Sequence, residues 1–267
     1  MGIFLLFCHK LKIKGLPSTK LPAKIPATIM RKIVFAFAAL AMISCKEEKK
    51  EGNLHIKGNV EGLKQGTLYI QKIVDTALVA VDTIVIKGNS HFESHLTIDS
   101  PEMLYLFLDR GETNSIDNNL MFFAEPGNMT IDTRLDSFFA AAKITGSENQ
   151  KLFEEYRKIM SRYKNTQLSL TEEKLRALQF NRAVSSDFDK KNSDNLKRKY
   201  LMAINFALNN KDHDIAPYIA LADIYNANIK YLDTIDKSMA PKIAQSKYGK
   251  MLTKFVADRK QAEQKQQ

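Results

Sequence analysis

Two histidines and a glutamate stand close together in the segment HFESHL, and these residue types could do chemistry. His91 and His95 are four residues apart, with Glu93 between them. Imidazole and carboxylate groups bind metals, but four residues of an extended strand span roughly 13 Å. One ion cannot bridge that length, so we predict no metal site and interpret both histidines as ordinary surface residues. His213, in KDHD, is interpreted as part of a turn or a helix start.

The other polar residues form no recognisable catalytic arrangement. The sequence has no G-x-S-x-G, H-E-x-x-H, P-loop or G-x-G-x-x-G motif, and its carboxylates are scattered. A hydrolase acting on envelope glycans would rest on these carboxylates alone, and no pair can be nominated. We therefore predict a protein that is not an enzyme, with no catalytic residue, no cofactor-binding residue and no cofactor.

Three short motifs could accept a covalent modification. Asp75-Thr76-Ala77, Asp82-Thr83-Ile84 and Asp233-Thr234-Ile235 resemble the O-glycosylation site of exported Bacteroidota proteins. Patterns of three residues also arise by chance, and Thr83 can equally be a plain strand residue. Of the three threonines, Thr76 is our candidate.

The cysteines carry the clearest chemical signal. Cys8 and Cys45 are the only two, and Cys45 follows the apolar segment IVFAFAALAMIS, which itself follows Met30-Arg31-Lys32. A cationic head, twelve apolar residues and a small residue before a cut point indicate a secretory signal peptide. The alternative is a buried helix, but nothing after Ser44 continues the apolar pattern. Removal of the leader would leave no thiol in the folded part, which excludes disulfides, thiolate metal sites and cysteine nucleophiles there.

Met42-Ile43-Ser44-Cys45 resembles the lipobox of bacterial lipoproteins, although Met42 stands where Leu is usual. The resemblance implies cleavage after Ser44, a diacylglycerol on the Cys45 sulfur and a further acyl chain, such as palmitate, on its amino group. Each buried methylene contributes about 0.8 kcal/mol, so two or three chains anchor a protein durably. The implied location is the outer membrane, on its periplasmic or cell-surface face.

Residues 1–29 fit a signal peptide badly, because such a peptide should begin at the chain start. We interpret Met30 as the true initiator. A membrane-associated element built on GIFLLF is the weaker alternative, since six apolar residues cannot cross a bilayer. Lys46-Glu47-Glu48 resembles an export signal to the outer face of the outer membrane, and a plain solvated tether explains it equally well.

The net charge of +10 belongs mainly to the leader. Residues 1–44 hold seven basic and no acidic residues, which leaves 33 basic against 30 acidic residues, a net of +3, in residues 45–267. Basic stretches such as NLKRKY lie on predicted helices, where Lys and Arg normally face solvent. We therefore predict no nucleic-acid partner. The predicted partners are a membrane, through the lipid anchor, and an unknown envelope protein or ligand.

Short apolar alternations separated by turn residues begin at Asn53 and predict seven or eight strands. Later segments have apolar residues three and four apart, which predicts helices. Ser147 with Gln150 resembles a capping box that starts the first helix, Ser169 with Glu172 suggests a second start, and Pro217 fits the first turn of a short helix near Ile215. The predicted fold class is α+β: an N-terminal antiparallel β-sandwich or partly open barrel, then an all-α extension.

Four strand segments in a fixed order resemble the domain of unknown function 4369 over about residues 53–150. These segments are IKGNVEGLKQGTLYIQK, VDTIVIKGNSHFE, FFAEPGNMTID and ITGSENQ. That domain occurs in Bacteroidota lipoproteins, commonly ahead of a helical spacer and a thioredoxin-like thiol-disulfide oxidoreductase domain. This sequence has no C-x-x-C pair, so the resemblance implies the accessory module and the spacer without redox activity.

The predicted organisation begins with a leader, residues 1–44, in which 1–29 is a misassigned start and 30–44 is the lipoprotein signal peptide. A tether (45–52), the β domain (53–146), a helical region (147–260) and a polar tail (261–267) follow. The leading functional hypothesis is a non-enzymatic lipoprotein of the cell envelope that acts as a binding or accessory module. The alternative is an inactive or truncated member of the thioredoxin-like thiol-disulfide oxidoreductase family.

Overall fold

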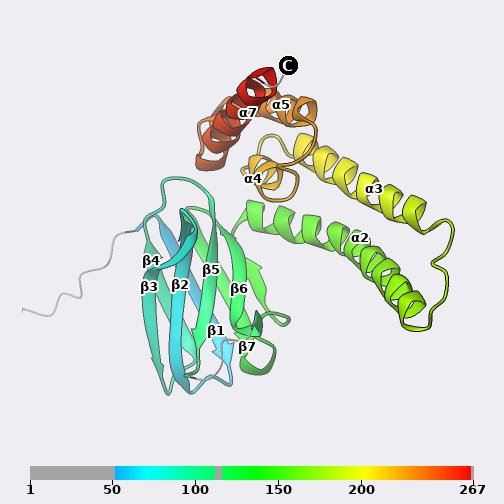
Figure 1. Cartoon of the computed structure of the whole chain (residues 1–267). Coiled ribbons are helices and arrows are strands. Elements are labelled where there is room, and N and C mark those ends of the chain that lie inside the picture. The colour runs from blue at the N-terminus through cyan, green and yellow to red at the C-terminus, as the bar shows by residue number, and fades with distance from the viewer. Residues whose placement is uncertain (1–51, 112–115, 266–267) are drawn as a thin grey trace, which may run out of the picture. The chain divides into compact units, whose positions relative to one another are not determined.

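The computed structural model describes residues 52–111 and 116–265. All of these residues belong to one compact unit, Lys50–Gln267. The unit contains an eight-stranded β part followed by helices, so the predicted α+β fold class is confirmed (Figure 1).

The strands form two four-stranded sheets that pack as a sandwich. Their bounds are β1 (Leu54–Glu61), β2 (Gln65–Val74), β3 (Ala77–Lys87), β4 (His91–Leu96), β5 (Glu102–Asp109), β6 (Asn119–Ala124), β7 (Gly127–Arg134) and β8 (Lys143–Thr145). The strand orders are β4-β1-β7-β8 and β3-β2-β5-β6. Strand pairs are antiparallel except β1 with β7, which run parallel, so the first sheet is mixed.

The inward faces of the two sheets make the first hydrophobic core. Along β1, Leu54, Ile56, Gly58 and Val60 are buried and alternate with less buried side chains, as expected for a strand with one face in a core. Gly58 is required by close approach, because a Cβ at this position would collide with the Phe92 ring and the backbone carbonyl of Ile131.

The helices follow in chain order. Their bounds are α2 (Glu148–Gln179), α3 (Phe188–Asn209), α4 (Ile215–Ala222), α5 (Ile229–Ser238), α6 (Pro241–Ala244) and α7 (Lys247–Lys265). The predicted helix starts at Ser147 and Ile215 are confirmed. The start predicted at Ser169 is wrong, because Ser169 lies inside α2. This helix is continuous over 32 residues and contains neither Pro nor Gly. The polar tail stays helical to Lys265.

A second hydrophobic core joins the helices to the β part. It contains the first turns of α2, the last turns of α3 and the inward faces of α4 to α7, together with Met103 of β5 and Phe123 of β6. The rings of Tyr218 and Tyr248 pack edge-on against Phe123, with ring centroids 5.5 Å and 6.0 Å away. The sandwich and the helices therefore share buried surface.

None of the helices within the described residues combines the length and the apolar character that a membrane crossing requires.

Candidate functional site

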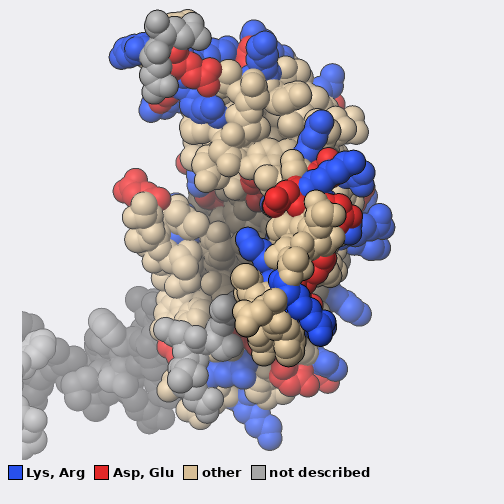
Figure 2. Space-filling view, turned by 45° about the vertical axis from the view of Figure 1, so that its right-hand side comes forward, with Lys and Arg blue, Asp and Glu red and all other residues tan. Residues whose placement is uncertain are grey.

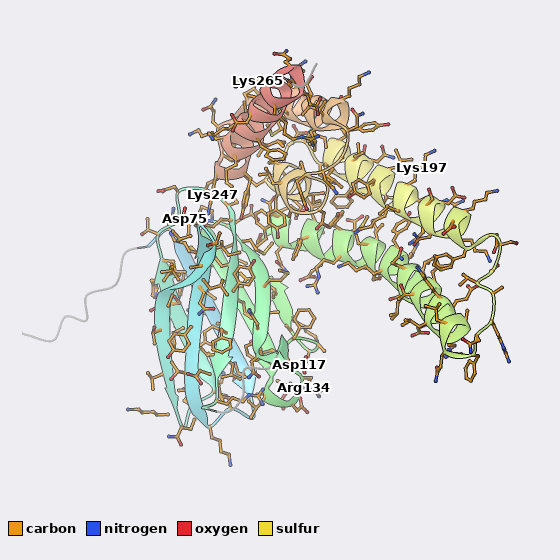
Figure 3. All side chains as sticks on the ribbon, in the orientation of Figure 1. Asp75, Asp117, Arg134, Lys197, Lys247 and Lys265 are labelled. Atoms are coloured by element: carbon orange, nitrogen blue, oxygen red, sulfur yellow. The ribbon has the colours of Figure 1, made fainter. Side chains whose placement is uncertain are left out.

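Cys45, the predicted lipidation site, lies outside the described residues, as do Cys8 and the whole predicted leader. Thr76, the predicted glycosylation site, lies in the two-residue turn between β2 and β3. Thr76 is exposed, and the preceding Asp75 has a φ of 55°, a left-handed conformation that Asp tolerates in tight hairpins. Figure 3 shows Asp75 at one end of the strands, and Asp117 and Arg134 toward the other end.

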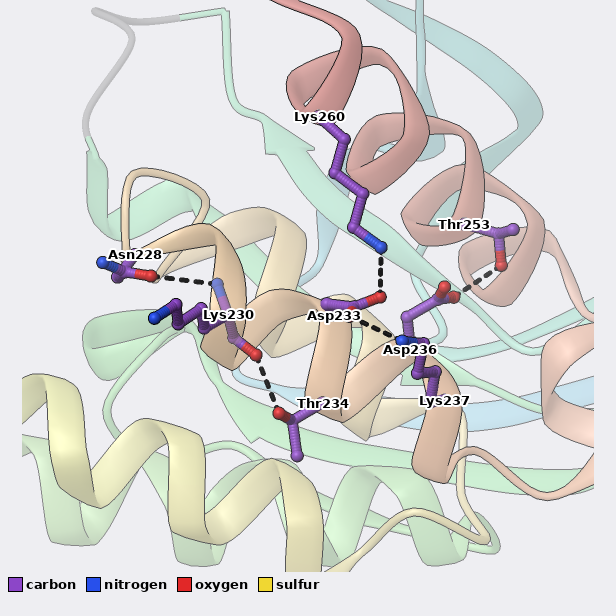
Figure 4. Close-up of polar contacts among 8 residues, drawn as sticks. All are labelled: Asn228, Lys230, Asp233, Thr234, Asp236, Lys237, Thr253 and Lys260. Atoms are coloured by element: carbon purple, nitrogen blue, oxygen red, sulfur yellow. Dashed lines mark hydrogen bonds and ion pairs between the residues drawn. The ribbon is translucent and has the colours of Figure 1, made fainter. Parts of the chain in front are cut away.

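The other two threonines of the glycosylation pattern lie inside regular elements. Thr83 is an exposed residue of β3, opposite Tyr69 of β2. Thr234 lies within α5, where its hydroxyl donates to the backbone oxygen of Lys230 at 2.7 Å (Figure 4). The preceding Asp233 pairs with Lys237 at 2.8 Å and with Lys260 at 2.5 Å. Of the three threonines, Thr76 is therefore the one that lies in a turn. The backbone there belongs neither to a strand nor to a helix.

His91 and His95 lie on the same strand, β4, but they do not meet. The Nδ1 atom of His91 lies 2.9 Å from the side-chain oxygen of Asn89. His95 instead lies directly opposite His55 of β1, and their rings stack with centroids 4.1 Å apart and an interplanar angle of 11°. The sequence pattern of β4 alone does not indicate His55, because only the pairing register of β1 with β4 brings His55 next to His95.

Glu93 bridges the two stacked rings. Its Oε1 atom is hydrogen-bonded to Nε2 of His55 and lies 3.4 Å from Nε2 of His95. The hydrogen bond with His55 holds the pKa of Glu93 below its usual value, and the positive charge of Lys57, 3.9 Å away, acts in the same direction. We call His55, Glu93 and His95 the histidine cluster.

His213 precedes α4, and its backbone oxygen accepts from the amide of Ala216 at 3.1 Å, which agrees with the predicted role at a helix start. Its Nδ1 atom is buried, and among the described residues it has no hydrogen-bond partner.

The far halves of α2 and α3, with the segment that joins them, form a two-helix projection over residues 161–199, which we call the arm. Figure 1 shows both helices extending away from the strands. Across the arm, whose residues are all described, the buried side chains are Leu170, Phe188 and Asn195. Two helices without a third layer cannot cover both of their faces. The arm therefore leaves apolar surface in solvent.

The exposed apolar side chains of the arm concentrate near its tip. Leu175 and Leu178 are 60% exposed, and Phe180 is 61% exposed. Leu168 and Leu196 are also exposed, nearer the base of the arm. Exposed side chains of this size that are scattered singly need no explanation, whereas contiguous exposed apolar patches are typical of interaction surfaces in general.

The arm also holds the excess positive charge of the folded part. Residues 161–199 contain ten basic and five acidic residues, a net of +5, whereas residues 45–267 as a whole have a net of only +3. In Figure 2, Lys and Arg side chains are frequent along the right-hand side of the view, with Asp and Glu side chains and uncharged surface among them, and Figure 3 shows Lys197 on α3. The arm thus combines apolar and basic surface.

Two open grooves lie between the helices of the arm. Tyr163 and Asn195 line both grooves, whose volumes are about 400 Å³ and about 440 Å³. Asn195 donates to the backbone oxygen of Tyr163 at 3.1 Å, so a polar contact holds the helices together where a larger apolar core would otherwise be needed. Arg162, Lys191 and Arg198 line the first groove, and Leu168 and Leu196 line the second.

Hydrogen bonds attach the start of α2 to the sandwich and to α4. Glu125, in the turn between β6 and β7, accepts from the hydroxyl of Ser147 and from the backbone amide of Asn149 at 2.9 Å. The side-chain oxygen of Asn149 accepts from the backbone amide of Ile215 at 2.8 Å, and the side-chain oxygen of Gln150 accepts from the backbone amide of Phe123 at 2.7 Å. These bonds fix the direction in which α2 leaves the sandwich.

Comparison with known proteins identifies part of the chain. Residues 54–153 match the family model of a domain of unknown function, DUF4369. The match begins with β1 and ends in the second turn of α2, so the part of the chain that is similar to DUF4369 covers the strands and precedes most of the helices. The resemblance predicted from the four strand segments is confirmed for this domain. No curated protein and no solved structure matches the chain.

Proposed function

We propose that this protein is a non-enzymatic binding or accessory module of the cell envelope, anchored through a lipidated Cys45, and that the arm holds its partner. The observation that carries the proposal is the arm, which displays apolar side chains and a net charge of +5 on a projection. A binding function needs such a surface and does not need a catalytic group.

The chemistry of the arm indicates the kind of partner. Leu175, Leu178 and Phe180 would insert into an apolar depression, because large exposed side chains gain most from being covered. Arg176 and Arg182 lie next to them in the sequence and would face acidic side chains at the rim of the interface. The proposed partner is therefore an envelope protein with an apolar patch bordered by acidic residues.

The anchor is tested in cells by fractionation and lipid labelling. The wild-type protein should appear in the membrane fraction and incorporate an alkyne-bearing fatty acid, and Cys45→Ala should abolish both. Cys45→Ala removes the sulfur atom to which the diacylglycerol would be attached, so we expect the variant to lose both membrane location and labelling. A soluble, unlabelled wild-type protein would contradict the anchor while leaving the arm untested, so the arm has its own experiment.

The arm is tested by capture of partners from envelope extracts with the full chain. A double variant, Leu175→Ser with Leu178→Ser, should recover at least tenfold less of the partner that the wild-type protein captures. The control is Tyr231→Ser with Met251→Ser, which changes two exposed apolar residues of α5 and α7 and should capture as much as wild type. Raising the salt concentration from about 50 to about 500 mM should weaken capture several-fold, because salt screens surface charge.

Circular dichroism spectra of both double variants should match the wild-type spectrum, so that lost capture is not lost folding. Wild-type levels of capture by the arm variant would reject the arm as the binding surface. Capture that is lost in the control but kept in the arm variant would place the partner on α5 and α7 instead.

A further inference from the structure

The outward face of the first sheet assembles three metal-ligating side chains from two strands. Strand β1 pairs antiparallel with the edge strand β4, which places His55 opposite His95 and Lys57 opposite Glu93. Residues two apart in a strand point to the same face, so Glu93 and His95 share the face of His55. The histidine cluster is therefore a product of strand register, and no single segment of the sequence contains it.

The atoms of the cluster that could bind a cation are already close together. One ligand atom from each residue, two imidazole nitrogens and one carboxylate oxygen, lies within 4.8 Å of the others. In this arrangement the carboxylate oxygen of Glu93 stands between the Nε2 atoms of His55 and His95. Three side chains on two hydrogen-bonded strands need little further ordering to enclose an ion.

We propose that His55, Glu93 and His95 bind one divalent transition-metal ion, with Zn²⁺ as the reference ion. Two imidazoles and one carboxylate form a ligand set that zinc uses with a further position open to water or to another ligand. Imidazole nitrogens favour Zn²⁺, Ni²⁺ and Cu²⁺ over Mg²⁺ and Ca²⁺, which prefer oxygen ligands.

Binding requires a small rearrangement of the two rings. Stacked rings hold their in-plane nitrogen lone pairs in two nearly parallel planes, whereas an ion needs the lone pairs to converge on one point. The side chain of His55 is 20% exposed and that of His95 is 35% exposed, so both border solvent and can tilt about their side-chain bonds. An ion would also take the place of the proton that Glu93 and His55 share in their hydrogen bond.

One neighbouring charge opposes the ion. The ammonium group of Lys57 lies 3.9 Å from the bridging oxygen of Glu93, and it would compete with a cation for that oxygen. Lys57 is well exposed, so it can swing into solvent when the ion enters. Its removal should therefore strengthen metal binding, an effect that a purely structural cluster would not produce.

The test titrates Zn²⁺ into the full chain, purified without a polyhistidine tag, and follows the heat of binding. The expected result is a saturable site that weakens at least tenfold in His55→Asn and in His95→Asn and several-fold in Glu93→Gln. Lys57→Met should bind Zn²⁺ several-fold more tightly. Mg²⁺ in large excess should not compete, because the site is rich in nitrogen.

The matched control is His91→Asn, because His91 lies on the same strand and outside the cluster, bonded to Asn89. This variant should bind Zn²⁺ within twofold of wild type, and all variants should keep the wild-type thermal unfolding temperature without metal. Every variant retains Cys8, His9 and Cys45, so any Zn²⁺ binding by these residues is the same throughout the series and cancels in the comparison. Equal binding by wild type and by the His55 and His95 variants, or no saturable binding at all, would overturn the proposal and leave a hydrogen-bonded triad that supports β4.

Discussion

The carboxyl group of Asp214, at the start of α4, is 4% exposed, and its Oδ1 atom has no hydrogen-bond partner among the described residues. Burial raises the pKa of Asp214; a hydrogen bond with Ser246 opposes that rise, and the negative charge of Glu125 adds to it. The folded state therefore holds a proton on Asp214 more tightly than the unfolded state does. This contribution to stability is present at pH values below the unfolded pKa, and it is lost as the pH rises through the folded pKa.

At the residue scale, we predict that Asp214→Asn stabilises the protein near neutral pH. The amide is similar in shape and carries no charge, so it removes the cost of burying a carboxylate. Urea unfolding should show a higher free energy of unfolding than wild type at about pH 7.5, and the difference should shrink toward zero at about pH 3, where the carboxyl is protonated in both states.

Asp212→Asn is the matched control, because Asp212 is exposed and two residues away. It should change the free energy of unfolding by less than about 0.5 kcal/mol at either pH, as is usual for exposed sites. A destabilised Asp214→Asn variant at neutral pH would mean that the carboxylate has a partner that outweighs its desolvation.

At the element scale, the start of α2 is the junction between the sandwich and the helices. Ser147 accepts from the backbone amide of Gln150 at 2.9 Å, as the predicted capping box requires. Among the described residues, the side-chain oxygen of Gln150 instead accepts from the backbone amide of Phe123 in β6. Glu125 supplies further acceptors from outside the helix, and its negative charge suits the positive end of the helix dipole.

Glu125→Ala should lower the free energy of unfolding by about 1–3 kcal/mol, because it leaves the amide of Asn149 and the hydroxyl of Ser147 without their acceptor. Chemical denaturation followed by circular dichroism measures the change. The matched control is Glu148→Ala, in the same first turn, since Glu148 is exposed and forms a surface ion pair with Lys151 at 3.1 Å. That change should cost less than about 0.5 kcal/mol, and equal losses in the two variants would argue against a specific role for Glu125.

At the scale of the whole folded unit, the sandwich and the helices share buried side chains. Phe123 is fully buried, although it belongs to a strand, and it lies within the helical core. The hydroxyl of Tyr248 accepts from the backbone amide of Met103 at 2.9 Å, and Lys247 forms an ion pair with the buried Glu102. Strands β5 and β6 thus contribute to both cores, and we expect the two parts to unfold together.

Phe123→Ala should lower the free energy of unfolding by about 3–5 kcal/mol, because it opens a cavity at the boundary between the two parts. Hydrogen exchange should show faster exchange in the sandwich and in α4 and α7 together. Phe180→Ala, at the tip of the arm, is the control and should cost less than about 1 kcal/mol, because its ring is already in solvent. Faster exchange in the helices alone would show that the two parts unfold separately.

The sequence by itself determined most of what depends on neighbouring residues. Alternating apolar residues and the cap at Ser147 located the strands and the first helix, because these signals act within a few residues. The DUF4369 resemblance could be recognised from the order of four strand segments. Local signals also misled at Ser169, where a cap-like pair lies inside a continuous helix, because a capping motif does not stop a helix whose neighbouring residues favour it.

The tertiary structure alone decided which residues meet across the chain. His55 stands opposite His95 through a register that is set over some forty residues, and Phe123 joins the helical core through packing that no local pattern encodes. The exposed apolar tip of the arm likewise follows from the lack of a third helix over residues 161–199, all of which are described. An amphipathic pattern shows that a face is apolar, but only the packed structure shows whether another element covers it.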